Sequence, residues 1–193
     1  MARRSDHTAE ELKTLAIDKA IEIIDTSGIA GLSARRVTAA MGYTVGTLYH
    51  AFGDLDTFLL HVNGRILDDW HDDLRTGMKR SRKDPLQFLV DSYLAYARQY
   101  RDRWVMLFSD GGGDTGRAMP PWYAEKVSRL FYLLESALRP HLAAGDDPAE
   151  TAKLLWASIH GICVLSLTGK LDVAGVNKPE KLITALLEHI LRK

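Results

Sequence analysis

The 193-residue sequence has one cysteine and contains no apolar run long enough to cross a membrane, which takes about 18 to 20 residues. Cys163 alone forms no disulfide within the chain and builds no cysteine-based zinc cluster. The N-terminus, from Met1 to His7, turns acidic and helical before the apolar core of a signal peptide could begin. We therefore expect a soluble, cytoplasmic protein.

Strand patterns and catalytic motifs are also lacking. No segment alternates β-branched and polar residues between turns, and helical spacing dominates throughout. No His-Glu-x-x-His, nucleophile–base arrangement or dinucleotide fingerprint occurs. We expect an all-α protein that is not an enzyme and needs no cofactor or metal. An all-helical enzyme that uses His160 or the acidic residues between Asp68 and Asp73 is the alternative in another class.

Two weaker signals have simpler explanations. The glycine-rich segment from Gly111 to Gly116 lacks the Gly-Lys-Ser/Thr ending of a phosphate loop and follows no strand, so a flexible connector is expected. Asp68, His71 and Asp72 share one helix face, where a divalent ion could bind, but an acidic face in contact with solvent is far more usual.

The net charge is zero, yet the acidic residues are unevenly distributed. No acidic residue occurs from Thr26 to Gly53, and this stretch contains Arg35 and Arg36. It can approach phosphate without repulsion between like charges. The acidic residues of the first 53 all precede it: Asp6, Glu10, Glu11, Asp18, Glu22 and Asp25.

Capping residues and prolines mark the helices. Thr8 with Glu11 forms a capping box for a first helix that Gly28 ends. Asp54 begins a long helix, and prolines begin the later ones at Pro85, Pro120-Pro121, Pro148 and Pro179. Breaks are expected at 81–84, 109–117, 143–147 and 171–178. The pattern predicts about nine helices.

The segment from Gly31 to Phe52 predicts two short helices joined by a tight turn. Ser33 and Thr44 are placed to cap these helices, and Gly42 supplies the left-handed backbone of the turn. Val37, Ala40 and Leu48 are expected to face inward. The outer face of the second helix is small or neutral, which suits the major groove of DNA, where Thr47 can meet base edges and Val45 a thymine methyl group.

At these residues the sequence resembles the TetR family of bacterial transcription regulators. The resemblance rests on Gly31-Leu32-Ser33, on Met41-Gly42-Tyr43-Thr44 and on the ending Leu48-Tyr49-His50-Ala51-Phe52. It implies a DNA-binding domain over residues 1–53 and an effector-binding and dimerisation domain over 54–193. The residues that it places at DNA bases or phosphates are Arg35, Thr44, Val45, Gly46, Thr47, Tyr49 and His50.

One position departs from the family pattern. The family usually has a phosphate-binding lysine at the start of the fourth helix, where this sequence has Leu55 between Asp54 and Asp56. We expect weaker non-specific DNA binding, with Arg3 and Arg4 as the candidate replacement for the lysine. The alternative function is a small-molecule binding protein of the same fold that has lost DNA binding.

The C-terminal part is rich in aromatic residues, which fit either ordinary core packing or a largely apolar effector pocket. Trp156, His160 and Gly161 resemble a Trp-His-Gly subgroup of the family's C-terminal domains. His160 is interpreted either as a hydrogen-bonded core residue or as an effector contact. The candidate pocket residues are Trp70, Tyr93, Tyr96, Trp104, Phe108, Trp122, Trp156 and His160.

The final helix carries a wide apolar stripe that a monomer would leave in water. Together with the helix from Pro148, it resembles the family's four-helix dimer bundle. A two-fold homodimer would present two recognition helices about 34–36 Å apart, or a multiple of that, to a palindromic operator. We expect a repressor that a small, largely apolar or aromatic effector releases. The expected interface residues are Leu155, Ile159, Ile162, Leu182, Leu186 and Ile190.

Overall fold

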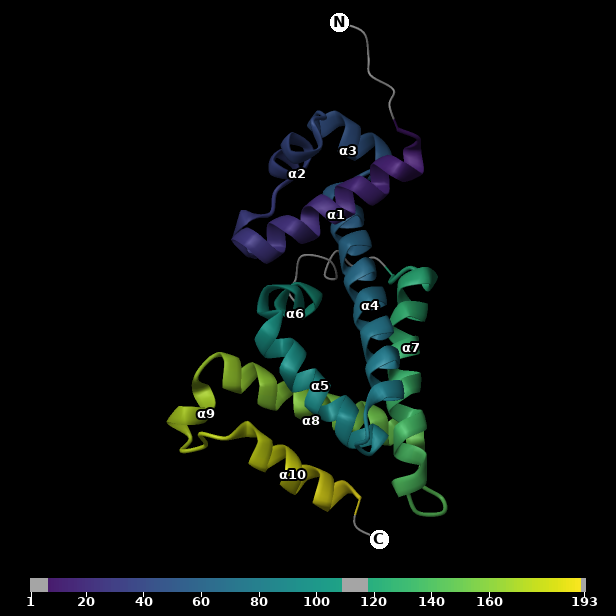
Figure 1. Cartoon of the computed structure of the whole chain (residues 1–193), viewed down its shortest axis with the longest axis vertical. Coiled ribbons are helices and arrows are strands. Elements are labelled where there is room, and N and C mark those ends of the chain that lie inside the picture. Colours follow the sequence, from purple (N-terminus) through teal and green to yellow (C-terminus); the bar gives the residue numbers. More distant parts are fainter. Residues whose placement is uncertain (1–6, 109–117, 192–193) are drawn as a thin grey trace, which may run out of the picture. The chain divides into compact units, whose positions relative to one another are not determined.

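The computed structural model describes residues 7–108 and 118–191, which form helices joined by short loops (Figure 1). No strand occurs in these ranges, and nine of their ten α-helices have seven or more residues. The prediction of an all-α chain of about nine helices is confirmed. Arg3, Arg4 and the segment from Gly111 to Gly116 lie outside the described residues.

The helices follow one another along the chain with few irregular residues between them. They are α1 (Ala9–Ser27), α2 (Ala34–Met41), α3 (Val45–Phe52), α4 (Leu55–Arg80), α5 (Pro85–Gln99), α6 (Arg101–Phe108), α7 (Pro121–Leu138), α8 (Pro148–Leu167), α9 (Lys170–Val173) and α10 (Pro179–Ile190). Two 3₁₀ turns, Ile29–Gly31 and Arg139–His141, follow α1 and α7. In the described part of the chain, no helix has both the length and the hydropathy needed to span a membrane.

Most of the helix starts agree with the capping signals. Thr8 and Glu11 form both bonds of the capping box, and Ser33 accepts from the amide of Arg36 at 3.2 Å. Prolines stand in the first turns of α5, α7, α8 and α10. Two breaks were not predicted. α5 ends at Gln99 and α6 begins at Arg101, with no proline or glycine between them to mark the break. α8 ends at Leu167 and α9 begins at Lys170, so the break expected at 171–178 starts too late and overlaps α9.

The described chain forms two compact units. Unit 1 comprises residues 1–70 and 100–124, and unit 2 comprises residues 71–99 and 125–193. Unit 1 therefore holds α1, α2, α3 and α6, unit 2 holds α5, α8, α9 and α10, and α4 and α7 contribute residues to each. The functional boundary at residue 53 stays a prediction.

The core of unit 1 is built around α1, which packs against α2, α3 and α6. Ala16, Ala20 and Ile24 are almost fully buried on one face of α1, because they recur at helical spacing. Leu48 and Phe52 bring the inner face of α3 into the same core. The packing of Leu48 and Phe52 therefore fixes the orientation of α3 and determines which of its side chains face outward.

The core of unit 2 is built around α8, which packs against α5, α9 and α10. Leu155, Ile159 and Cys163 lie four residues apart on its inner face and are buried. Burial raises the pKa of the Cys163 thiol to about 11, so this group is protonated at neutral pH. An ion pair of 2.6 Å between Arg98 and Glu180 joins α5 to α10 at the surface.

Candidate DNA-binding and effector sites

The turn between α2 and α3 needs a glycine for its backbone and not for space. Gly42 has a φ of +76° in the left-handed region, and a Cβ atom added there would meet nothing within 4 Å. The amide of Tyr43 donates to the carbonyl of Thr38 at 2.9 Å and closes the turn. The predicted helix-turn-helix is therefore present, with the turn residue as expected.

Val37 and Leu48 hold the two short helices together, being 0% and 2% exposed. The expectation that Ala40 also faces inward is wrong, because Ala40 is exposed and Thr38 is buried instead. Burial of Thr38 is tolerated because its hydroxyl donates within the helix, with Ala34 O at 2.9 Å and Arg35 O at 3.2 Å. A polar residue thus takes a position that the apolar pattern did not assign to it.

The outer face of α3 is open to solvent. Gly46, Tyr49 and His50 are exposed, Tyr49 by 41%, while Val45 and Thr47 are half-buried. Thr44 occupies the N-cap position with extended backbone, but the predicted side-chain cap is wrong. Its Oγ1 instead lies 3.3 Å from Oγ1 of Thr47. The two hydroxyl groups are thus neighbours on the exposed face.

The neighbouring arginines Arg35 and Arg36 have different surroundings. Arg36 donates to Oγ of Ser27 at 2.7 Å and to the carbonyl of Gly31 at 3.4 Å, which ties it to the loop after α1. A Cβ atom on Gly31 would lie 2.7 Å from Cβ of Ser27, which has no freedom to move away, so this loop requires glycine for close approach. Arg35 is exposed at the start of α2 and is the arginine available to a phosphate or a base.

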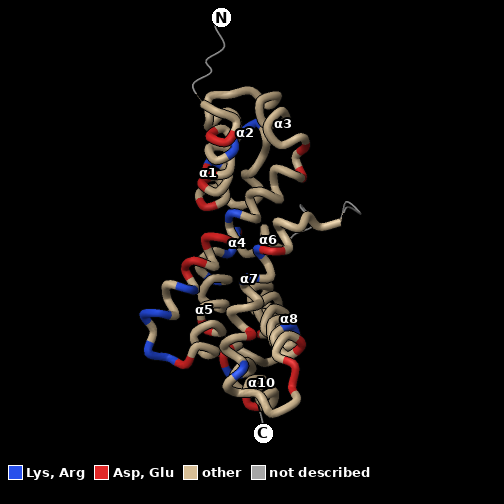
Figure 2. Tube along the Cα trace, turned by 90° about the vertical axis from the view of Figure 1, so that its right-hand side faces the viewer, with Lys and Arg blue, Asp and Glu red and all other residues tan. Residues whose placement is uncertain are grey.

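The acidic residues of α1 are largely engaged in ion pairs. Glu10 pairs with Lys13 at 3.0 Å, and Glu22 pairs with Lys19 at 2.7 Å. Figure 2 shows these charges on α1, while the tube of α3 is uncharged. The acidic residues of α1 therefore lie outside α3, whereas Asp54 and Asp56 follow directly after its end.

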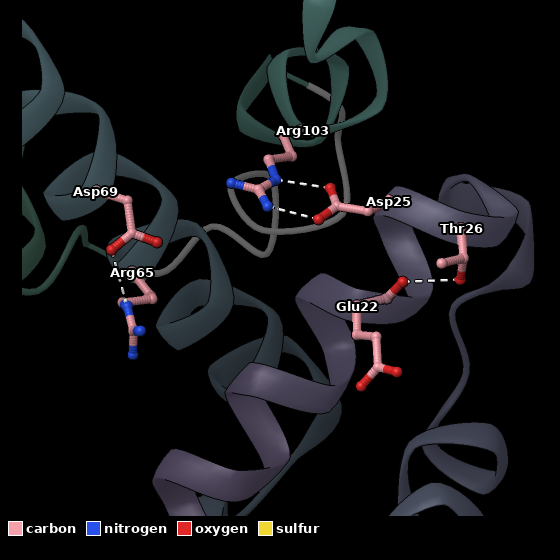
Figure 3. A network of polar contacts seen from close by, with 6 residues as sticks. All are labelled: Glu22, Asp25, Thr26, Arg65, Asp69 and Arg103. Atoms are coloured by element: carbon pink, nitrogen blue, oxygen red, sulfur yellow. Dashed lines mark hydrogen bonds and ion pairs between the residues drawn. The ribbon is translucent and has the colours of Figure 1, made fainter.

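A network of polar contacts joins α6 to the C-terminal end of α1 (Figure 3). The Arg103 guanidinium binds both carboxylate oxygens of Asp25, with 2.7 Å between Nε and Oδ1. Oδ1 of Asp102 accepts from the amide of Ile29 at 3.4 Å. Arg65 of α4 pairs with Asp69 on its own helix at 2.9 Å. We refer to the contacts of Asp102 and Arg103 with the end of α1 as the α1–α6 clamp.

The eight predicted pocket residues divide equally between the two units. In unit 1, Trp70 and Trp104 are buried, Trp122 is half-buried and Phe108 is 39% exposed. The Trp104 and Phe108 rings lie 5.1 Å apart, whereas Trp122 stacks on His61 at 4.6 Å. The structure thus brings Trp104 and Phe108 together and gives Trp122 a different aromatic neighbour.

In unit 2, three predicted pocket residues contact one another. The Tyr93 hydroxyl lies 2.8 Å from Nδ1 of His160, and the Trp156 ring stacks on His160 at 5.5 Å. Phe131, which was not predicted, packs edge-on against Trp156 at 5.5 Å. Burial lowers the pKa of His160 below its usual value, which favours a neutral imidazole at pH 7. Tyr96 is also buried in unit 2.

Asn63 is a buried polar residue that the sequence reasoning missed. It lies on α4 and is only 3% exposed, and its Nδ2 donates to the carbonyl of Met106 on α6 at 3.3 Å. The sequence did contain a signal for it: Asn63 is an amide residue next to Val62, on a helix whose apolar residues recur at the spacing of a buried face. A polar side chain on such a face requires a partner.

The predicted interface residues fall into two groups. Leu155 and Ile159 are buried in the core of their own chain, whereas Ile162 is half-buried. The exposed apolar residues of α8 include Leu154 and Leu165, at 57% and 43%. On α10 the residues Leu182, Leu186 and Ile190 are half-exposed at a spacing of four.

The acidic segment of α4 contains no group of metal ligands. Among the described side chains, no three His, Cys, Asp or Glu residues are placed to hold an ion. His71 is 8% exposed, and its Nδ1 lies 3.2 Å from Oδ1 of Asp72. This pair is a local contact on one helix.

A model of the family described as "Tetracyclin repressor-like, C-terminal domain" matches residues 86–190, more than half of the chain. The chain belongs to the TetR family. It is an HTH-type transcriptional regulator of that family, and the helix-turn-helix of unit 1 agrees with this membership.

Individual relatives agree with the family assignment. A curated "uncharacterized HTH-type transcriptional regulator" of Mycobacterium tuberculosis is 23% identical over 158 residues, covering 81% of this chain and 70% of that protein. The structure of a TetR-family transcriptional regulator from Pectobacterium atrosepticum has a TM-score of 0.70 and 22% identity, and covers 100% of this chain and 99% of that one. RolR in complex with resorcinol has a TM-score of 0.67 and 17% identity, with 95% and 87% covered. The two structural similarities show the fold, and the finer Trp-His-Gly subgroup stays a prediction.

Proposed function

We propose that this TetR-family regulator is a cytoplasmic repressor that binds a palindromic operator as a homodimer and is released by a small, uncharged, largely apolar or aromatic effector. The observation that carries the DNA-binding part is the outer face of α3. It is exposed, bears no Asp, Glu, Lys or Arg side chain, and is held in place by the buried Leu48 and Phe52. A helix of this kind fits a major groove.

The individual DNA contacts follow from the positions of the side chains. Thr47 and Val45 lie on the outer turn of α3, where a hydroxyl can read a base edge and a methyl group can contact thymine. Gly46 allows the backbone to come close to the duplex. Tyr49 and His50 are exposed toward the end of α3 and are assigned to sugar and phosphate, as is Arg35 at the start of α2.

The proposed dimer uses the exposed faces of α8 and α10. Leu154, Gly161 and Leu165 lie on one face of α8, and a Cβ atom added to Gly161 would meet nothing within 4 Å, so a second helix could approach closely. We therefore move the proposed interface on α8 from Leu155 and Ile159 to this face, and keep Ile162 beside it. On α10 the interface keeps Leu182, Leu186 and Ile190.

The proposed effector class rests on the contacts within unit 2. Trp156 and Phe131 supply aromatic surface, and the pair of Tyr93 and His160 can both donate and accept a hydrogen bond without a formal charge. Such surroundings favour an uncharged aromatic molecule over an ion, whose desolvation would not be compensated. The predicted pocket residues of unit 1 are kept as a candidate effector site of their own. Because RolR is similar in fold and binds resorcinol, resorcinol is the first probe.

The effector acts by preferring the protein conformation that does not fit the operator. A ligand shifts an equilibrium only by the ratio of its affinities for the two conformations. Release of DNA therefore requires that the effector bind the DNA-free conformation more tightly.

The decisive experiment is operator binding by Thr47→Ala, measured by fluorescence anisotropy on palindromes selected from random DNA. A lost base contact of about 1–3 kcal/mol predicts a fall in affinity of roughly five-fold to 150-fold. Thr26→Ala is the matched control, because Thr26 lies at the far end of α1 and its hydroxyl only donates to the carbonyl of Glu22. Wild-type affinity in Thr47→Ala would contradict the assigned role of α3.

Gly46→Ala is a second variant for the same experiment. A Cβ atom at Gly46 has room in the protein, with Oγ1 of Thr44 at 3.7 Å, so alanine should raise the stability by up to about 1 kcal/mol through helix propensity. The added methyl group should nevertheless lower operator affinity, because it lies on the face proposed to meet DNA. A loss of both stability and affinity would point to a structural role instead.

A second candidate function is effector binding without DNA binding. It is favoured by Leu55, which is 37% exposed at the start of α4 where the family resemblance implies a lysine. This second function would be established if the wild-type dimer selects no operator from random DNA and yet binds resorcinol.

A further inference from the structure

Asn63 has one polar atom that no described residue satisfies. Its Nδ2 donates to the carbonyl of Met106, whereas its Oδ1 is fully buried and has no hydrogen-bond partner among the described residues. The side chain is 3% exposed, between Val62 and Ile66, which are both fully buried on α4. Bulk water therefore does not reach this oxygen.

The orientation of the amide is fixed by its neighbour on α6. If the amide were turned over, Oδ1 would face the Met106 carbonyl and two acceptors would be in contact, so Nδ2 must take this place. A buried acceptor without a donor costs about 1–3 kcal/mol. A leucine of nearly the same shape would avoid that cost but would take the donor away from the Met106 carbonyl, so the amide stands at a site where only one of its two polar groups has a partner among the described residues.

The surroundings of Asn63 are largely apolar. Trp104 and Met106 on α6 are both 3% exposed, and the Trp104 ring packs against Phe108. The amide of Asn63 is uncharged, so its carbonyl oxygen can bind a ligand group only by accepting a hydrogen bond from a donor that points toward it. It supplies no counter-charge for a buried cation, and its carbonyl oxygen repels the oxygens of a carboxylate.

We propose that Asn63 is the polar anchor of an effector site in unit 1, and that its Oδ1 accepts a hydrogen bond from a hydroxyl or N–H group of an uncharged ligand. This rests on the proposed function, because the ligand is taken to be the effector of the regulator. The ligand class is thereby narrowed to molecules that combine an apolar or aromatic body with at least one neutral hydrogen-bond donor. Ethers and hydrocarbons of the same shape are discriminated against.

The same amide connects the ligand to the DNA-binding helices. Asn63 holds the carbonyl of Met106, and Met106 lies three residues after Arg103 on the short helix α6. Arg103 and Asp102 form the α1–α6 clamp with the end of α1. A ligand that binds Asn63 therefore acts on the helix that contacts α1.

The test compares phenol with its methyl ether, anisole, by isothermal titration calorimetry on the full chain. The two probes have similar aromatic bodies, but only phenol can donate to Oδ1. Wild-type protein should prefer phenol by about ten-fold, the ratio that corresponds to one buried hydrogen bond, and Asn63→Leu should bind both probes within about three-fold. Asn177→Leu, the same substitution at an exposed position, should retain the wild-type preference.

Thermal unfolding of the ligand-free variants separates the anchor from a structural role. Asn63→Leu loses one hydrogen bond and one unsatisfied acceptor, so its Tm should stay within a few degrees of wild type. A large fall in Tm together with an unchanged phenol preference would overturn the proposal, since the amide would then serve the fold, for example by holding a bound water. Equal binding of phenol and anisole to wild type, or no binding of either, would also overturn it.

The outcome is distinct from that of the proposed DNA-binding function. Operator affinity is measured without probe, and Asn63→Leu should retain it within about three-fold. A wild-type protein that binds no operator but prefers phenol refutes the repressor function and supports the anchor. A protein that binds its operator but shows no phenol preference refutes the anchor alone.

Discussion

Gly42 and Gly46 stand four residues apart and are glycines for different physical reasons. Gly42 has a positive φ that other residues adopt at a cost of about 1–2 kcal/mol, whereas Gly46 lies in α3 with room for a side chain. Only the requirement for glycine at position 42 comes from the fold of the chain itself. The second glycine is therefore the better indicator of a partner, and its helix propensity cost of about 1 kcal/mol is consistent with close approach to DNA.

His160 predicts a dependence of stability on pH. Its folded-state pKa is lowered by burial, so the unfolded chain takes up a proton at higher pH than the folded one. Well above pH 6.5, the usual pKa, His160 is neutral in both states and does not make the stability depend on pH. As the pH drops through and below this value, the unfolded chain is protonated first and the free energy of unfolding falls. Urea unfolding between about pH 7 and pH 5 should show a shallower fall for His160→Gln than for wild type.

The control for this prediction is His189→Gln, which alters an exposed histidine on α10. It should retain the wild-type pH profile. A His160→Gln profile that parallels wild type would show that other groups account for the acid sensitivity.

Residue-scale features were predictable where the cause is local. Thr8, Ser33 and Gly42 act through bonds or dihedral angles within a few residues, and each was identified from the sequence. Thr44 and Ala40 were misassigned because the outcome depends on which neighbour a side chain meets. Thr44 meets the hydroxyl of Thr47 in place of a helix amide.

At the scale of the elements, the α1–α6 clamp predicts measurable coupling between two helices. Arg103 is 20% and Asp25 37% exposed, so solvent screens their attraction only in part. A double-mutant cycle with Asp25→Ala and Arg103→Ala, followed by urea unfolding, should give a coupling of about 0.5–1.5 kcal/mol. If the clamp also transmits the effector signal, the single variants will change the effector concentration that releases half of the operator.

The matched control is the pair of Lys83 and Asp91, which are 60% and 40% exposed. Its cycle should give a smaller coupling, within about 0.5 kcal/mol of zero. A charge-swapped protein, Asp25→Arg with Arg103→Asp, should recover part of the coupling. Equal values for the two cycles would mean that the clamp is an ordinary surface pair.

The helices themselves were predictable, and their long-range contacts were not. Prolines and caps gave the starts of α5, α7, α8 and α10, because these signals act within one turn. The break at Tyr100 has no such signal. Asp25 and Arg103 are 78 residues apart in sequence, and their pairing becomes visible only when α6 packs on α1.

For the whole molecule, Leu154 predicts the site of assembly. Leu154→Glu places a charge on the exposed face of α8, so sedimentation velocity should show a monomer, with a large loss of operator affinity. Lys153→Glu introduces the same side chain one residue away, with a larger change of charge, and should remain a dimer. Leu155→Ala should instead destabilise the chain by about 2–5 kcal/mol, because Leu155 is fully buried within it. A dimeric Leu154→Glu protein would place the interface elsewhere.

The register of this interface could not be predicted from sequence. α8 has apolar residues on both faces, so the pattern does not distinguish the stripe that packs on α5 and α10 from the stripe left exposed. A shift of one residue, from Leu155 to Leu154, changes the assignment. On α10 the polar residues are more regularly placed, and Leu182 and Leu186 are half-exposed.

Alkylation of Cys163 can measure local opening of unit 2. The thiol is 2% exposed and protonated, so an alkylating reagent can reach it only when unit 2 opens. The rate of labelling therefore counts these openings, with no engineered probe. A slower rate in the presence of an effector would reveal ligand-induced tightening of unit 2 even where the average conformation is unchanged.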